Sequence, residues 1–450
     1  MIAKISTQVV SFLLLPLYTA LLTTEDYGRV DIYTSLAMIV IPFLTLQVEM
    51  ALFRFFITDE DQASQKEIVS TSYAIIVGMT AIISVPYLII SGVIGLLHRW
   101  LLFAYYISQA LAAVLLQTCR AKGDNMGYGM ASFVSSALAV VLNVLFIAGL
   151  GWRVEGILSA SVIAQLASCA YMLWRTKIHR YLSFAAISMA RSRQLLSYAV
   201  PLVFNQIASW GINYSDRLII VANWGEGVNG IFSVANKFSN ITGTLFNVYN
   251  VAWTENVVRS MNDEDGTDYI SWMFEFTFNV YLMLITGIIN LLPLIFNIMV
   301  NEAFHEAYQH VPILLVAMLF SGMAATLGSI YIAYSKTREV SITTMLAGVC
   351  NVAVHFALLK KCGLFAASIS TLVSFAALFV YRYISVRKFF SIHFSMKKVA
   401  LQLTVLAFSW LAYSIGNKLL VLTGLAMNLG CIAWMILRNK NKIMRIFKKR

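Results

Sequence analysis

Polar and charged side chains recur with helical spacing inside two long apolar segments, residues 196–222 and 228–257. The first segment carries a polar face, at i, i+4, i+8 and i+11, formed by Asn205, Ser209, Asn213 and Asp216. The adjoining face is formed by Gln206, Trp210, Asn213 and Arg217, and the second segment has a stripe of Lys237, Asn240, Thr244 and Asn247. A charged side chain at bilayer depth costs on the order of 3 kcal/mol, so it normally faces a bundle interior or a wet cavity. The two segments are therefore predicted to line a polar cavity.

The basic candidates for this cavity can hold an anionic group. They are Arg217 and Lys237 of the two segments, together with Lys4 and Arg54 nearer the amino terminus. Arginine binds phosphate oxygens with a fork of N–H groups, and lysine supplies a point charge. A second interpretation stays open, because Lys4 and Arg54 lie near segment ends, from which long basic side chains reach the aqueous interface. Arg217 can also pair with its neighbour Asp216.

Three carboxylates, Glu49, Asp216 and Glu255, are candidates for coupling transport to an ion gradient. A carboxylate inside the membrane can take up and release a proton as a gate opens. Glu49 lies furthest inside its apolar segment. For Glu255 the alternative is solvation near a helix end, and no motif identifies a coupling ion.

Asparagines and aromatic residues crowd the same two segments, and the binding candidates among them are Asn205, Asn213, Asn240, Asn247 and Trp210. Amides suit sugar hydroxyls, and aromatic faces suit the C–H surfaces of a sugar. Each unpaired hydroxyl in hydrocarbon would cost roughly 2 kcal/mol or more, so a sugar that crosses the membrane needs such partners. The alternative is ordinary hydrogen bonding between packed helices, which contributes less than ~1 kcal/mol per bond.

The composition is that of a polytopic, all-α membrane protein. Of the 450 residues, 59% are hydrophobic and 12% are charged, whereas soluble domains have about 25% charged residues. Segments near the ~20 residues that cross a bilayer fall at fourteen places, namely residues 4–22, 30–56, 69–94, 99–118, 126–150, 154–174, 196–222, 228–257, 270–298, 309–334, 340–359, 363–386, 398–416 and 420–437. We interpret the first as a retained helix, because no small-residue cleavage site follows it. Three prolines, Pro201, Pro293 and Pro312, can break or bend their helices.

The placement of lysine and arginine predicts the orientation in the membrane. Of the 33 such residues, 25 fall on one side of the predicted segments and six on the other, with Arg217 and Lys237 inside them. An excess of this kind marks the cytoplasmic side, so both termini are predicted to be cytoplasmic. The same rule explains the net charge of +12, and we expect no nucleic-acid partner.

The sequence shows no arrangement of residues for catalysis. It lacks an HExxH motif, a GxxxxGK[ST] phosphate loop and a Ser/His/Asp arrangement. The five cysteines are scattered without a CxxC pair, and His305 and His310 lie near glutamates at a spacing that matches no established metal site. We therefore expect no enzyme activity, no cofactor and no bound metal.

The two halves of the chain show a faint internal repeat. An acidic, glycine-containing turn opens a long helix at EDYGRVDIYTSLAMIV and again at EGVNGIFSVANKFSNIT, and the alignment places Gly28 on Gly230. Residue identity is low, so the repeat rests on the pattern of helix, turn and helix. Duplicated bundles with a substrate site between the halves recur among transporters.

Two stretches carry a family resemblance. SYAVPLVFNQIASWGINYSDRLII with GIFSVANKFSNI resembles the seventh and eighth helices of the polysaccharide flippases, and LLLPLYTALLTTEDYGRVDIYTSL resembles their first two. This family, with its O-antigen and capsule-unit flippases, belongs to the multidrug/oligosaccharidyl-lipid/polysaccharide exporter superfamily. Asp216, Arg217 and Lys237 match its polar positions, and Phe232 departs from a common tyrosine.

The resemblance implies two six-helix lobes around a central cavity, with two extra helices at the carboxyl end. The predicted domains are an amino-terminal lobe at 1–180, a basic cytoplasmic linker at 181–195, a second lobe at 196–390, and the extra helices with a basic tail at 391–450. The implied function is to move undecaprenyl-diphosphate-linked oligosaccharide across the bacterial inner membrane by alternating access. Membrane lipids, a polysaccharide polymerase and chain-length proteins are the implied partners.

Other functions stay open at this point. One is export of drugs or of the peptidoglycan lipid precursor by another member of the superfamily, although the surplus of cationic candidates disfavours cationic drugs. Another is a membrane polymerase or ligase that acts on the same lipid carrier. Such enzymes usually present a large outward loop, and the outward loops predicted here are about a dozen residues long.

Overall fold

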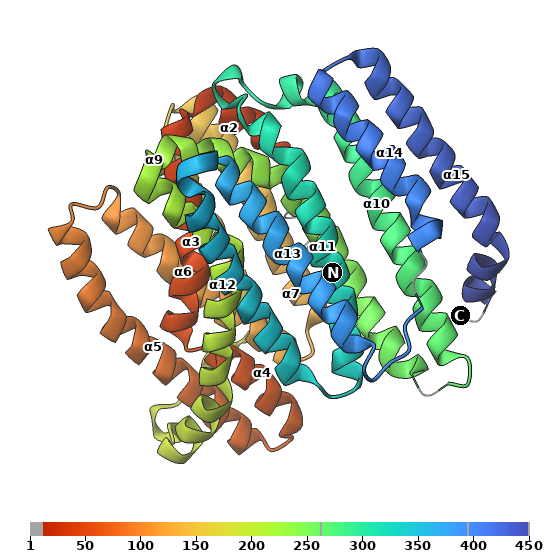
Figure 1. Ribbon diagram of the computed structural model, residues 1–450. Coiled ribbons are helices and arrows are strands. Elements are labelled where there is room, and N and C mark those ends of the chain that lie inside the picture. Colours follow the sequence, from red (N-terminus) through yellow and green to blue (C-terminus); the bar gives the residue numbers. More distant parts are fainter. Residues whose placement is uncertain (1–11, 262, 394–395, 449–450) are drawn as a thin grey trace. The chain divides into compact units, whose positions relative to one another are not determined.

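The computed structural model describes residues 12–448 except 262 and 394–395, and this part of the chain is helical without strands (Figure 1). It confirms the all-α membrane fold. Eleven of the described helices are long and apolar enough to cross a membrane. The fourteen predicted segments fit this number, because the 72-residue α9 (Met189–Ser260) holds two of them, the helix at 399–415 is shorter, and the first segment is described only from residue 12. The protein is thus a multi-pass membrane protein.

The chain folds as two compact units, of which the first ends at Gly230 and the second begins at Ile231. The described helices that lie wholly within the first unit are α2 (Leu15–Leu21), α3 (Thr24–Thr45), α4 (Val48–Thr58), α5 (Gln62–Val93), α6 (Arg99–Ala121), α7 (Asn125–Asn143) with the π-helical turn η1 (Val144–Gly149), α8 (Val154–Thr176), and the short turns η2 (Ile178–Arg180) and η3 (Phe184–Ala186). The predicted lobes, with a linker at 181–195, stay a prediction.

The predicted segment 30–56 is broken in the structure, so its prediction as one helix is wrong. Helix α3 ends at Thr45 and α4 begins at Val48, because Leu46 and Gln47 have positive φ angles of 49° and 56°. Residues other than glycine rarely adopt this left-handed conformation. At membrane depth, an interrupted helix is tolerated where its freed backbone groups are buried in protein or line a wet cavity.

Helix α9 (Met189–Ser260) contains both of the polar segments and runs through the boundary of the two units. Its one non-helical residue is Gly225, with φ 86° and ψ 178°, which lies in the predicted turn between those segments. Glycine adopts this backbone conformation without the clash that a Cβ atom would cause. The predicted turn is therefore present as a kink at Gly225, between the two helical stretches that make up α9.

A pair of glycines, Gly28 and Gly230, lets α3 and the first part of α9 touch backbone to backbone. A Cβ atom on Gly28 would lie 1.8 Å from the carbonyl oxygen of Glu226, and one on Gly230 would lie 1.9 Å from that of Thr24. The contact is reciprocal, since the alignment that places Gly28 on Gly230 also places Thr24 on Glu226. The side chain of Asn229 adds a hydrogen bond of 2.9 Å to the carbonyl oxygen of Gly28.

The second unit contains two groups of packed helices, visible in Figure 1. Its helices after α9 are α10 (Gly266–Met299), α11 (Ala307–Ala333), α12 (Thr337–Cys362), α13 (Phe365–Val386), α14 (Met396–Ile415) and α15 (Lys418–Lys448), with the turn η4 (Glu302–Phe304). Helix α13 packs on α11 and α12, and α14 and α15 pack together on α10.

Arg382 joins the first of these groups through neutral partners. It is buried and donates hydrogen bonds to the carbonyl oxygens of Ala324 and Val340 and to the hydroxyls of Thr343 and Thr344. Among the described residues it forms no ion pair with a carboxylate. Five donor contacts thus replace the water that its guanidinium loses on burial.

Candidate functional site

The first unit contains a pocket of about 590 Å³ where α4 meets the first part of α9. We call it the Arg54 pocket, and its lining residues are Gln47, Met50, Phe53, Arg54, Ile57, Tyr198, Leu202, Asn205 and Gln206. The pocket therefore starts at the break between α3 and α4 and brings together two of the predicted site residues, Arg54 and Asn205. Three amide side chains and one guanidinium share this lining.

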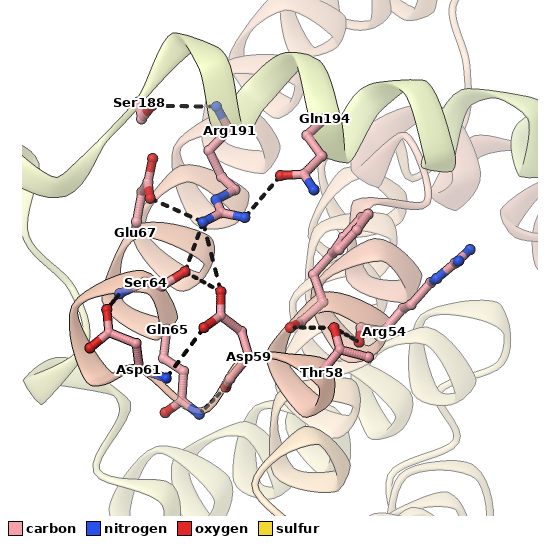
Figure 2. A network of polar contacts seen from close by, with 11 residues as sticks. Arg54, Thr58, Asp59, Asp61, Ser64, Gln65, Glu67, Ser188, Arg191 and Gln194 are labelled. Carbon is pink, nitrogen blue, oxygen red and sulfur yellow. Dashed lines mark hydrogen bonds and ion pairs between the residues drawn. The ribbon is translucent and has the colours of Figure 1, made fainter.

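The guanidinium of Arg54 is accessible from this pocket. Its guanidinium carbon lies 4.5 Å from the ring centre of Tyr198 and 5.8 Å from that of Phe55. The Arg54 side chain is exposed, and no carboxylate among the described residues forms an ion pair with it. Stacking on an aromatic face orients a guanidinium and leaves its N–H edge available. Figure 2 shows this end of the side chain pointing away from the neighbouring ion pairs.

Those ion pairs fix the start of α9 against the first turns of α5 and the loop between α4 and α5 (Figure 2). The Arg191 guanidinium lies 3.2 Å from Glu67 and 3.8 Å from Asp59, and it donates a hydrogen bond of 2.7 Å to Ser64. Ser64 in turn donates to Asp59. Because Tyr198 follows Arg191 by two helical turns, this network sets the position of the aromatic face under Arg54.

Glu49 lies in the first turn of α4, just beyond the helix break. Its side chain is 3% exposed, and its Oε2 atom has no hydrogen-bond partner in the described structure. An ionised carboxylate in such a place needs a cation or a proton as a partner.

Arg217 is not in the Arg54 pocket. It follows Asn205 by about 18 Å along α9, is buried, and forms an ion pair of 2.8 Å with Asp31 of α3. It also donates to the carbonyl oxygen of Asn213 and lies over the ring of Tyr214. The ion-pair partner is thus Asp31, and the pair ties α9 to α3 close to the glycine crossing.

The other candidates on this part of α9 have mixed environments. Trp210 is half-buried and donates from Nε1 to the carbonyl oxygen of Ser35 at 2.9 Å. Asp216 is buried, whereas Asn205 and Asn213 are exposed. An amide exposed on a membrane helix needs water or a polar ligand beside it, so the exposed pair favours a wet route along this face.

In the second unit, the candidates on α9 are partly exposed. Lys237 is half-buried, and Asn240 and Asn247 are exposed. Glu255 is exposed and forms an ion pair of 2.5 Å with Arg259, one turn further on. This arrangement favours solvation near the helix end as the role of Glu255. Lys4 lies outside the described residues.

Comparison with known proteins gives the family. A model of the family described as "Polysaccharide biosynthesis protein" matches residues 1–254, more than half of the chain. The chain belongs to this polysaccharide biosynthesis family. A relative from Haemophilus influenzae, an uncharacterized membrane protein, is 22% identical over 265 residues, which are 56% of this chain and 62% of the relative. The chain thus matches less than two thirds of that relative's length.

Solved structures of transporters share the fold of this chain. The lipid II flippase MurJ in an inward closed conformation has a TM-score of 0.77 at 13% identity, over 98% of this chain and 99% of its own. An inward-facing multidrug resistance MATE transporter of the MOP superfamily has a TM-score of 0.71 at 16% identity, over 85% and 94% of the two chains. At such identities the likeness shows the fold alone.

Sequence reasoning missed several residues of this family member's site. Asp31 was visible as an acidic residue in an apolar segment, but its pairing with Arg217 joins residues far apart in the chain. Gln47 and Tyr198 gave no signal of their own. The useful clue was indirect, since Tyr198 precedes Asn205 by two helical turns on the same segment and Gln206 is the next residue.

Proposed function

We propose that this protein is a flippase that moves undecaprenyl-diphosphate-linked oligosaccharide units across the bacterial inner membrane by alternating access. The observation that carries the proposal is the guanidinium of Arg54, which stacks on Tyr198 and has no ion pair among the described residues, in an amide-lined pocket of a polysaccharide biosynthesis family member. The excess of lysine and arginine on one side of the chain supports cytoplasmic termini. The same pattern places the end of α4 that carries Arg54 on the cytoplasmic side, where the substrate is made.

The groups of the pocket fit the two polar parts of such a substrate. The N–H edge of Arg54 can grip two phosphate oxygens at once. The amides of Gln47, Asn205 and Gln206 supply donors and acceptors for sugar hydroxyls. On the second unit we propose Lys237 as a further contact of the diphosphate, with Asn240 and Asn247 for the sugars.

Arg54→Gln should slow flipping at least tenfold, because it removes a charge-assisted contact of about 1.5 to 3 kcal/mol while it keeps a polar stem. The measurement is the amount of lipid-linked oligosaccharide on the cytoplasmic leaflet in a strain that lacks the gene and carries the variant. Arg193→Gln is the matched control, since Arg193 is exposed near the start of α9 and lines neither this pocket nor the other one described below. Equal clearance in both variants would contradict the role of Arg54, and no accumulation in the strain that lacks the gene would contradict the flippase function.

The same assay separates the peptidoglycan precursor from polysaccharide units. Both lipids carry a diphosphate, and the fold is shared with a lipid II flippase. Accumulation of an oligosaccharide-bearing lipid, with normal lipid II turnover, supports the proposal. Accumulation of lipid II alone assigns the protein to cell-wall synthesis. A polymerase and chain-length proteins are the proposed consumers of the flipped unit.

We further propose that Glu49 couples flipping to a proton or cation. Glu49→Gln should remove the dependence of flipping on external pH or sodium, because the amide keeps the shape of the carboxyl group and cannot bind or release the ion. The measurement is the flipping rate in reconstituted vesicles as each gradient is imposed in turn. A variant that keeps the full gradient dependence of the parent protein would exclude Glu49 from the coupling.

A further inference from the structure

A second pocket of the first unit, about 660 Å³ in volume, lies at the carboxyl-terminal ends of α4 and α6, on the side predicted to be cytoplasmic. We call it the Arg120 pocket, and its polar and charged lining consists of Asp59, Glu60, Gln65, Arg120, Lys122, Asn125 and Tyr181. It shares Phe53 and Ile57 with the Arg54 pocket. The two pockets are therefore neighbours with a common apolar wall.

Arg120 is held in this pocket by aromatic rings. Its guanidinium carbon lies 4.6 Å from the ring centre of Phe53 and 5.6 Å from that of Tyr128, and one N–H donates to Gln117 at 3.1 Å. No carboxylate in the part of the chain that the structure describes forms an ion pair with it. Most of its five N–H donors thus stay available to a ligand.

Lys122 stands beside it in the turn after α6. Its ammonium lies 4.3 Å from the ring centre of Tyr181 and donates one hydrogen bond of 2.5 Å to the carbonyl oxygen of Thr176. Two further N–H donors remain. Burial lowers the pKa of Lys122 from its ordinary value, as expected for an ammonium that is partly removed from water.

The nearby carboxylates are mostly engaged elsewhere. Asp59 accepts from Ser64 and lies near Arg191. Asp124 caps α7 and pairs with Arg175, whose hydrogen bond holds the pKa of that carboxyl below its usual range. Of the acidic residues in the lining, this leaves the exposed Glu60 against two cations. The lining thus has two cations and two carboxylates, and Asp59 is the carboxylate already engaged by Ser64 and Arg191.

We propose that the Arg120 pocket is a second anion site, which receives the diphosphate group of the lipid-linked substrate on the cytoplasmic side before it reaches Arg54. The proposal rests on the flippase function proposed above. A point charge from Lys122 and a fork from Arg120 suit a diphosphate, and the shared wall of Phe53 and Ile57 makes the step to Arg54 short. Two sites of similar and moderate affinity let the diphosphate pass from one to the other, whereas a single very tight site would release it slowly.

The test is calorimetric titration of the purified full-length protein in phosphatidylcholine nanodiscs with inorganic pyrophosphate. We expect two pyrophosphates per chain. Arg120→Gln should weaken one site at least tenfold and leave the other unchanged, while Arg54→Gln should do the opposite. Glu60→Gln should strengthen pyrophosphate binding at the Arg120 site a few-fold, because it removes a negative charge that repels the anion. Arg193→Gln is the control for charge alone, and melting temperatures check that each variant is folded.

Wild-type binding in both Arg120→Gln and Lys122→Gln would overturn the second site. Geranylgeranyl diphosphate should displace pyrophosphate from both sites, and failure to displace it at the Arg120 site would assign that site to a soluble anion and overturn the proposed role. The two proposals fail separately. A single pyrophosphate site in the parent protein, with flipping lost in Arg54→Gln, overturns only the second site. Two pyrophosphate sites in the parent protein, with no accumulation of lipid-linked oligosaccharide in the strain that lacks the gene, overturn the flippase proposal.

Discussion

Gly28→Ala should prevent most of the protein from folding. The added methyl group would lie 1.8 Å from the carbonyl oxygen of Glu226 and 2.7 Å from the backbone nitrogen of Gly230. Both neighbours are backbone atoms, so no side chain can move aside, and α3 and α9 must separate. Overpacking of a well-packed contact typically costs about 1 to 3 kcal/mol, and the clash here is with backbone, so the upper end or more is expected.

The measurement is the yield and melting temperature of detergent-solubilised protein on size exclusion. Gly78→Ala is the matched control, because it places the same methyl group in a membrane helix where no atom lies within 4 Å. Gly230→Ala should reproduce the defect of Gly28→Ala, since it meets the carbonyl oxygen of Thr24 at 1.9 Å. If Gly28→Ala melts with the control, the close crossing of α3 and α9 is wrong.

Arg217→Ala should destabilise the protein by about 3 to 5 kcal/mol, because it leaves the carboxylate of Asp31 largely buried without its cation. The side chains of the pair are 5% and 14% exposed, and the distance of 2.8 Å is that of a charge-assisted hydrogen bond. Asn229 lies 3.3 Å from the same Asp31 oxygen, which is a weak substitute for a guanidinium. The loss should appear in the melting temperature before any effect on transport is measured.

A paired variant decides between a structural role and a binding role for Arg217. Asp31→Asn with Arg217→Gln removes both charges together and keeps two hydrogen-bonding side chains. If the ion pair only joins α3 to α9, the pair should recover most of the stability and most of the flipping. Recovered stability without flipping would instead place Arg217 among the residues that bind the diphosphate, which is the role predicted from the sequence.

The helices could be predicted because the bilayer requires long apolar runs, and the break at Leu46 and Gln47 could not. Neither residue is a glycine or proline, so nothing local marks the left-handed turn. Proline is the local signal expected to break a helix, yet the helices run on through Pro201, Pro293 and Pro312. Tertiary packing, rather than the local sequence, sets where these helices are interrupted.

The site could be predicted in part for a related reason. Residue type and spacing selected Arg54 and Asn205, which line one pocket, because both stand out as polar groups in apolar segments. Residue type and spacing do not show whether a basic side chain forms an ion pair in the folded protein. Arg54 is open and Arg217 is paired, and the difference lies in Asp31, whose proximity comes only from the crossing of α3 and α9.

The reciprocal contact of Gly28 and Gly230 is what a symmetric pair of identical chains makes where each copy meets the same surface of the other. A gene duplication that fused two such copies would leave this contact inside one polypeptide. Because backbone touches backbone there, selection acts on the absence of a side chain, and the surrounding residues are free to drift. Two glycines can thus keep a record of common descent that the rest of the aligned sequence has lost.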